Sequence, residues 1–174
     1  MNIRKARVED AAAIANITNP IIRDTLVTFT TDERDVSRIA VDIERRGSAF
    51  LVAEQGNDVV GFATYGPFRS GPGYARSCEH SVQLSPNARG QGTGRTLMVA
   101  LEQVARAADV HVLVAGISSA NPGAVAFHAS LGFVQVGRMP EVGWKWGQWL
   151  DLILMQKILA PQSSVAPDTG ETPR

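Results

Sequence analysis

A glycine-rich segment in the middle of the chain has the residue types and spacing of an anion-binding loop. Residues 82–84 (Val-Gln-Leu) end a strand-like run, and residues 89–95 (Arg-Gly-Gln-Gly-Thr-Gly-Arg) lead into a segment with helical character. Glycines let the backbone approach a ligand closely and leave its amides unshielded. Amides at a helix N-terminus, together with the helix dipole, favour a phosphate group. The segment therefore predicts a site for an anionic cofactor.

Two common nucleotide-binding motifs do not fit this spacing. A dinucleotide-binding fold needs G-x-G-x-x-G near the start of a βαβ unit, with an acidic residue about 20 residues further on. Here the glycines follow G-x-G-x-G halfway along the chain, and Asp109 is the only acid at about the right distance, in a loop-like segment. A P-loop needs a lysine where this chain has Arg95 and a glycine where it has Arg89. Both assignments fail.

The arrangement Arg89-Gly90-x-Gly92-x-Gly94 resembles the pyrophosphate loop of the GCN5-related N-acetyltransferase (GNAT) family. In that family the loop binds the pyrophosphate of acetyl-coenzyme A, so the resemblance implies acetyl-CoA as the co-substrate. The alternative is a tight turn that binds no ligand. No residue is assigned to a metal. The residues that the resemblance assigns to acetyl-CoA are Val82, Gln83, Leu84, Arg89, Gly90, Gln91, Gly92, Thr93, Gly94, Arg95 and Asn121.

Length and composition indicate one globular domain. The chain has 174 residues, with 17 basic and 17 acidic side chains and a single cysteine, Cys78. The charge balance argues against nucleic acid or an anionic membrane as the main partner, and one cysteine fits a reducing compartment. The chain has no membrane-spanning apolar run and no signal-peptide core, so we expect a cytoplasmic protein. We expect residues 1–159 to form the acetyltransferase domain and residues 160–174, rich in Pro, Ser and Thr, to be a disordered tail.

Apolar periodicity and turn signals predict elements in the order β-α-α-β-β-β-α-β-α-β-β. Asn19-Pro20 is expected to end the first helix and Gly132 the last one. This order predicts an α/β fold with a single mixed, mostly antiparallel sheet flanked by helices, which is also the layout of the GNAT fold. The strands are expected at 3–8, 49–53, 59–65, 78–85, 112–117, 133–136 and 149–158, and the helices at 10–18, 36–46, 92–107 and 121–131.

Acetyl transfer from a thioester to an amine needs a base for the amine, donors for the thioester oxygen and a proton for the leaving thiolate. Glu79 could take the ammonium proton directly or through water, or it could be a surface glutamate of its strand. His128 stands where the family often has a tyrosine near the sulfur; it could protonate the thiolate, or it could be a hydrogen-bonded helix histidine. Asn121 can cap its helix, and the family uses such a residue on the pantetheine arm or the catalytic water.

The strands at 82–84 and 112–116 are expected to splay apart. Exposed backbone would then hydrogen-bond to the pantetheine amides, as a sheet edge does to an added peptide strand. Val82 and Leu84 would line the arm, and Gln83 would contribute its main chain.

Several segments are similar to one branch of the family, the phosphinothricin and methionine sulfone/sulfoximine N-acetyltransferases, over residues 3–159. The most specific are 68–70 (Phe-Arg-Ser), 79–82 (Glu-His-Ser-Val) and 138–152, which contains Lys-x-Gly-x-Trp-x-Asp. Carried over, the resemblance makes Glu79 the catalytic base. It also implies an arginine for the acceptor's α-carboxylate, with Arg69 as the first candidate and Arg76 as the second. The acceptor contacts implied are Phe29, Arg69, Pro72, Gly73, Tyr74 and Arg76.

Three positions depart from the branch. Gln83 replaces a tyrosine, and Pro67 replaces a common acid. Ala75 stands where the branch has an arginine, with Arg76 next along, and a shift of one residue in a strand reverses the face. These departures concern the acceptor more than the reaction.

The sequence therefore predicts a cytoplasmic N-acetyltransferase that moves acetyl from acetyl-CoA to the α-amine of a small amino acid. Methionine sulfone, methionine sulfoximine and phosphinothricin are the candidate acceptors, with direct transfer and Glu79 as general base. The family and the apolar segment 144–149 favour a homodimer. Two alternatives stay open: acetylation of protein or peptide amines, which needs an open groove, and a non-catalytic acyl-CoA sensor that uses the same loop.

Overall fold

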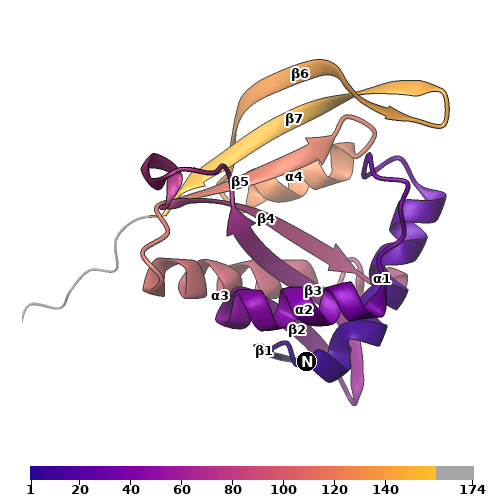
Figure 1. The fold of residues 1–174 in the computed structure, drawn as a ribbon, viewed down its shortest axis with the longest axis vertical. Coiled ribbons are helices and arrows are strands. Elements are labelled where there is room, and N and C mark those ends of the chain that lie inside the picture. Colours follow the sequence, from indigo (N-terminus) through magenta and orange to yellow (C-terminus); the bar gives the residue numbers. More distant parts are fainter. Residues whose placement is uncertain (160–174) are drawn as a thin grey trace, which may run out of the picture.

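A computed structural model describes residues 1–159, in which seven strands form one sheet in the order β1-β2-β3-β4-β5-β7-β6 (Figure 1). Neighbouring strands are antiparallel except β4 and β5, which are parallel. The strands are β1 (Asn2–Lys5), β2 (Phe50–Gln55), β3 (Asp58–Pro67), β4 (Ser77–Leu84), β5 (Val112–Ser118), β6 (Val134–Lys145) and β7 (Gln148–Ile158). The helices are α1 (Ala11–Asp24), α2 (Val36–Arg46), α3 (Thr93–Ala107) and α4 (Pro122–Ser130).

The expected fold class and order of elements are confirmed by this architecture. The bounds of α2 are those predicted from its apolar stripe, in which Ile39 and Ile43 are buried. The tail expected at 160–174 lies outside the described residues. Within residues 1–159, no helix has the length and apolar character needed to cross a membrane.

The predicted strand over 3–8 is too long, because a 3-10 turn, η1 (Val8–Asp10), follows β1. The Asp10 carboxylate accepts the backbone N–H of Arg7 at 2.7 Å and two N–H groups of Arg4 at 2.7 and 2.9 Å. The Arg4 guanidinium holds the pKa of this carboxyl below its ordinary value. A charged side chain therefore closes the turn that ends β1.

The predicted end of the first helix at Asn19-Pro20 is also wrong, because α1 runs through Pro20 to Asp24. Proline cannot donate to the carbonyl of residue i−4, here Asn16. Asn16 and Pro20 are both exposed on the solvent face, where water can reach that carbonyl. Ile17 and Ile22 are buried on the opposite face. Packing of the buried face therefore carries the helix past the proline.

Strand β6 is much longer than the predicted segment at 133–136. It forms a long hairpin with β7 that extends along one end of the molecule (Figure 1). Most of its residues are exposed, so its sequence lacks the apolar alternation that identifies a half-buried strand. The block at 138–145, singled out for its resemblance to the acetyltransferase branch, therefore belongs to the sheet.

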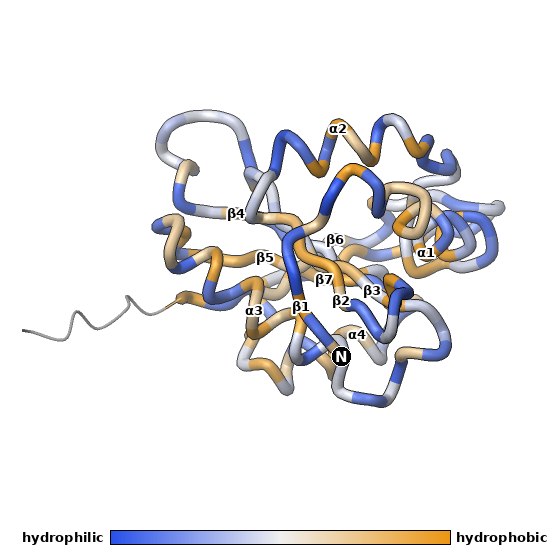
Figure 2. Tube along the Cα trace, turned by 90° about the horizontal axis from the view of Figure 1, so that it is seen from below, coloured by the Kyte–Doolittle hydropathy of each residue, from blue (hydrophilic) through white to orange (hydrophobic). Residues whose placement is uncertain are grey.

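Two apolar clusters cover the two faces of the sheet, and Figure 2 shows hydrophobic residues concentrated along its strands. One cluster contains buried residues of α3 together with Ala63 and Tyr65 of β3; the other contains residues of α1 and α2 together with Phe62. Side chains directly opposite one another in paired strands share a face. The register of β3 with β4 therefore directs His80 towards α3, and Glu79 towards α1 and α2.

Candidate active site

Strands β4 and β5 separate after three residue pairs, the last of which is Glu79 with Val114. This is the splay expected from the sequence for residues 82–84. A cavity of about 740 Å³ lies at the point of separation. Its walls come from β4, β5, the loop before α3, the first part of α4 and the end of α1 with the loop that follows it.

The residues predicted to bind the cofactor come together around this cavity, with Gln91 as the exception. The Gln91 side-chain amide instead donates to the Asn87 carbonyl at 2.6 Å. Asn121 caps α4, since its Oδ1 accepts the N–H of Ala124 at 3.1 Å. The predicted residues that line the cavity are Val82, Gln83, Leu84, Arg89, Gly90, Gly92, Thr93, Gly94, Arg95 and Asn121.

The glycine loop has the backbone that an anion site requires. Gly90 and Gly92 have φ values of 72° and 79°, in the left-handed region that other residues avoid. A Cβ on either residue would meet no other atom within 4 Å, so the loop is open towards a ligand. Helix α3 begins at Thr93 and directs its N-terminal amides and dipole at this opening. The loop therefore fits a pyrophosphate group.

Glu79 is not among the residues that line the cavity, but it lies next to one of them, on the face of the sheet covered by α1 and α2. One oxygen of its carboxylate lies 2.8 Å from the position that a Cβ on Gly116 would take, and Gly116 lines the cavity. The side chain is exposed, yet the neighbouring strands partly desolvate the carboxyl and raise its pKa above the ordinary value. An accessible carboxylate with a raised pKa is suited to accept a proton from an amine.

Two buried histidines meet on the opposite face of the sheet, and both line the cavity. The Nε2 atoms of His80 and His128 lie 3.0 Å apart, and Nδ1 of His128 lies 2.7 Å from the Ala124 carbonyl oxygen. A carbonyl oxygen only accepts, so Nδ1 of neutral His128 carries the proton and Nε2 accepts from His80. The helix backbone therefore fixes the tautomer of His128.

Burial lowers the pKa of both histidines, and for His80, where His128 adds repulsion, it falls to about 3. The pair is therefore neutral at physiological pH. The remaining nitrogen, Nδ1 of His80, is buried and has no hydrogen-bond partner among residues 1–159. In this arrangement neither nitrogen of His128 presents a proton to the cavity. For His128 to protonate the thiolate, as predicted, its ring must first break one of these two hydrogen bonds.

The loop between α1 and α2 is held against the sheet by buried polar contacts. Lys145 of β6 is buried, and its Nζ donates to the carbonyl oxygens of Ile22 at 2.6 Å and Thr28 at 3.0 Å. The hydroxyl of Ser118 on β5 donates to the Leu26 carbonyl at 2.7 Å. These bonds fix the wall of the cavity on the side of the expected acceptor.

Phe29, predicted to contact the acceptor, follows the part of this loop that lines the cavity. Its ring lies directly on Gly143 of β6, with ring carbons 2.6 Å from the position of a Cβ there. Val27 and Thr28 line the cavity, but Phe29 does not. The loop thus joins the cavity to the β6–β7 hairpin.

The two candidate arginines have different surroundings. Arg69 is exposed, and its guanidinium carbon lies 5.4 Å from the centre of the Phe68 ring. The Arg76 guanidinium pairs with the Asp109 carboxylate at 3.0 Å, and its Nε donates to the backbone carbonyl oxygen of Asp109 at 2.9 Å. Arg76 is therefore occupied at the α3–β5 loop.

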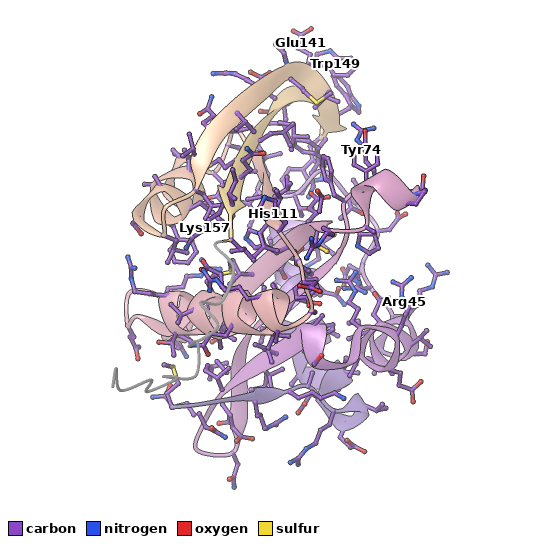
Figure 3. All side chains as sticks on the ribbon, turned by 90° about the vertical axis from the view of Figure 1, so that its left-hand side faces the viewer. Arg45, Tyr74, His111, Glu141, Trp149 and Lys157 are labelled. Carbon is purple, nitrogen blue, oxygen red and sulfur yellow. The ribbon has the colours of Figure 1, made fainter. Side chains whose placement is uncertain are left out.

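The predicted acceptor loop lies on the surface. Pro72, Gly73 and Tyr74 form a short exposed 3-10 helix, η3 (Pro72–Tyr74), and Figure 3 shows the Tyr74 side chain projecting from it. The structure does not bring the predicted acceptor residues into the cavity lined by the cofactor residues. Those that lie outside its lining are Phe29, Arg69, Pro72, Gly73, Tyr74 and Arg76.

His80 and Lys145 also shape the site, although neither was predicted from the sequence. For His80 a signal existed: it alternates with Glu79, so a strand there places the two side chains on opposite faces. For Lys145 the signal was weaker, since a lysine between two tryptophans reads as a surface residue. The side-chain oxygen of Gln83 is likewise buried without a partner among the described residues, although only its main chain was expected to matter.

The chain is similar to enzymes of known activity over nearly its full length. It is 42% identical over 159 residues to the L-amino acid N-acyltransferase MnaT of Escherichia coli, covering 90% of this chain and 92% of that protein. It is 39% identical to the L-methionine sulfoximine/L-methionine sulfone acetyltransferase of Salmonella typhimurium, covering 97% and 99% of the two chains.

Solved structures agree with these relatives. An acetyltransferase of Salmonella typhimurium, determined with acetyl-CoA, has a TM-score of 0.88 at 39% identity and covers 97% of this chain and 98% of that one. A phosphinothricin acetyltransferase of Sinorhizobium meliloti, in complex with acetyl-CoA, has a TM-score of 0.86 at 30% identity, covering 97% and 96%. The family model of the GNAT acetyltransferases matches residues 16–133. With its sheet, glycine loop and splayed strands, the chain belongs to the GNAT family of acetyltransferases.

Proposed function

We propose that this protein transfers an acetyl group from acetyl-CoA to the α-amine of a small amino acid such as methionine sulfone, methionine sulfoximine or phosphinothricin. The observation that carries the proposal is one cavity lined by a glycine loop suited to phosphate and by splayed strands, with the Glu79 carboxylate next to Gly116 of its wall. The activities named for the relatives, on L-amino acids and on methionine sulfoximine and sulfone, support the choice of acceptor.

The residues around the cavity suit the parts of acetyl-CoA. The amides at Gly90 to Thr93 would hold the pyrophosphate, with Arg89 and Arg95 as exposed cations beside them. The unpaired edge of β4 at 82–84 would hydrogen-bond the pantetheine arm. When bound, acetyl-CoA supplies the thioester whose carbonyl carbon is the electrophile.

Glu79 would accept the proton of the acceptor's ammonium group, leaving a neutral amine to form the C–N bond as the C–S bond breaks. Strand amides near 82–84 would donate to the thioester oxygen, on which negative charge develops. The thiolate must then gain a proton. A role of His128 in that step stays a prediction, since both of its ring nitrogens are engaged.

The test of this function is release of free thiol from acetyl-CoA with four separate acceptors. We expect rapid turnover with methionine sulfone, methionine sulfoximine and phosphinothricin, and little with a lysine-containing peptide. Turnover with the peptide alone would show that the acceptor is a protein or peptide amine and not a small amino acid. Binding of coenzyme A without turnover on any of the four would favour an acyl-CoA sensor.

Gly92→Ala is expected to raise the KM for acetyl-CoA at least tenfold, a loss of about 1.4 kcal/mol. The new methyl group would stand in the open space where the pyrophosphate approaches the loop amides. Gly56→Ala is the matched control, because Gly56 also has a positive φ (64°) and nothing within 4 Å, but lies in the β2–β3 turn. Steady-state kinetics and thermal unfolding of both variants check this. If Gly92→Ala has the same KM for acetyl-CoA as wild type, Gly92 is not part of the cofactor site.

The protein is expected to be a homodimer through the end of the β6–β7 hairpin. Trp144, Trp146 and Trp149 are each more than half exposed there, and Figure 3 shows Trp149 at the tip of the hairpin. Sedimentation equilibrium at micromolar concentration should give twice the chain mass of 18.7 kDa. Trp149→Glu should give the monomer mass. Val41→Glu, at an equally exposed apolar position on α2, should leave the dimer intact. A monomeric wild type would refute the dimer.

A further inference from the structure

Arg46, the last residue of α2, extends its guanidinium over β3, on the face of the sheet that carries Glu79. Its Nη1 donates to the hydroxyl of Thr64 at 3.1 Å. The guanidinium carbon and Nη2 both lie 3.7 Å from the position that a Cβ on Gly66 would take. The absence of a side chain at Gly66 therefore leaves room for the guanidinium to rest on the strand.

This guanidinium has no anionic partner among residues 1–159. The neighbouring Arg34 and Arg45 both pair with Asp42, whereas Arg46 forms no ion pair within residues 1–159. Arg46 is partly buried, and the loss of water lowers its pKa from the ordinary value. A guanidinium has five N–H donors, and the Thr64 hydroxyl is its only hydrogen-bond partner in the described part of the chain. A desolvated cation with free donors is a binding group for an anion.

The anion-binding group lies beside the proposed base. Gly66 is directly opposite Glu79 in the β3–β4 register, so the guanidinium on Gly66 and the Glu79 carboxylate are on the same face. Directly opposite Cβ positions are about 5 Å apart. Glu79 and Arg46 form no ion pair within residues 1–159, so the guanidinium over β3 and the carboxylate on β4 are both free to bind a ligand. An α-amino acid carries the two complementary charges, an ammonium group and a carboxylate, on one carbon atom.

We propose that Arg46 binds the α-carboxylate of the acceptor while Glu79 receives its ammonium group. The inference rests on the proposed function, and it places the recognition of the carboxylate on the face of the sheet covered by α1 and α2 rather than on the 69–76 loop. Arg76, paired with Asp109, is not needed for this role.

The test compares L-methionine sulfone with its α-carboxamide, which keeps the amine and side chain but lacks the negative charge. Wild-type enzyme should have a kcat/KM at least tenfold higher for the acid than for the amide. Arg46→Gln, which removes the charge and keeps a polar side chain, should reduce that ratio to about one by raising the KM for the acid. The KM for acetyl-CoA should stay constant.

Arg45→Gln is the matched control, since it removes the same charge from the adjacent residue. Its side chain projects from α2 into solvent (Figure 3) and is 68% exposed. This variant should keep the wild-type ratio. If Arg46→Gln also keeps it, the proposal is overturned. Should Arg46→Gln fail to fold, Arg46→Lys, which lacks the planar fork, should give an intermediate ratio; an unchanged ratio would again overturn the proposal.

A failure of the proposed function is seen separately, in the wild type. If no amino acid is acetylated, calorimetric binding of methionine sulfone and its carboxamide, with coenzyme A present, decides on Arg46. Tighter binding of the acid by wild type, abolished in Arg46→Gln, supports the carboxylate site. Equal binding of the two compounds by wild type rejects it.

Discussion

Glu79→Gln is expected to lower kcat about 10²- to 10⁴-fold, the range that a positioned general base contributes. The amide keeps the size of the side chain beside Gly116 but cannot accept a proton from the acceptor's ammonium group. The glycine loop and residues 82–84 are untouched, so the dissociation constant of acetyl-CoA should not change. Steady-state kinetics and calorimetric titration with coenzyme A separate the two effects. A kcat within twofold of wild type would remove Glu79 from the mechanism.

The pH dependence gives an independent check on Glu79. Desolvation raises the pKa of its carboxyl in the folded protein, so kcat/KM of wild type should rise with pH through a value above the ordinary 4.5. This rise of kcat/KM with pH should be absent in Glu79→Gln. The same shift means that the charged carboxylate costs stability at pH values above its folded-state pKa, because folding favours the protonated form. Glu79→Gln should therefore unfold at no lower temperature than wild type at pH 7, so lost activity would not reflect lost structure.

Gly143→Ala is expected to destabilise the protein by about 1–3 kcal/mol, the usual cost of inserting a methyl group into a packed contact. The new Cβ would lie 2.6 Å from ring carbons of Phe29, which are close to its backbone and cannot swing aside cheaply. Phe29 and the loop that carries Val27 and Thr28 must then shift. Because Val27 and Thr28 line the cavity on the side where we propose that the acceptor binds, the KM for the amino acid should rise about tenfold, or 1.4 kcal/mol.

Gly137→Ala serves as the control on the same strand. A Cβ there would meet Leu154 at 3.9 Å, an ordinary contact, so stability and both KM values should stay near those of wild type. Thermal unfolding and acceptor kinetics of the two variants test the role of the Phe29 contact. If Gly143→Ala behaves like Gly137→Ala, the loop does not depend on this packing.

Local patterns in the sequence were enough to predict most of the residues that line the cavity around the glycine loop. The glycine loop, the strand at 82–84 and the cap at Asn121 are short continuous motifs, so their spacing fixes their geometry. The apolar stripe of α2 likewise fixed its bounds. The end of α1 was mispredicted because packing of its buried face outweighs the effect of Pro20, and exposure of Asn16 lets water reach the carbonyl that Pro20 leaves without a donor.

The acceptor side depends on contacts between distant segments. Arg46 reaches Gly66 only because α2 packs across β3, and Lys145 reaches Ile22 only because the β6–β7 hairpin closes on the end of α1. Neither contact has a periodicity or motif in the sequence. The length of β6 was missed for a related reason, since an exposed edge strand has no buried face to impose alternation. The acceptor residues of the 69–76 loop were predicted only from the resemblance to relatives, and no spacing in the sequence indicates whether they reach the cavity.

The separation of β4 from β5 has a consequence for how the molecule holds together. Three residue pairs join the half of the sheet formed by β1–β4 to the half formed by β5–β7, so this seam is the least cross-linked line of backbone in the sheet. A ligand lying in the seam would restore the missing hydrogen bonds between the halves. Ligand at 100 times its dissociation constant adds about 2.7 kcal/mol to the free energy of unfolding. The co-substrate would thus act as a temporary strand, and the free enzyme would open most readily along this line.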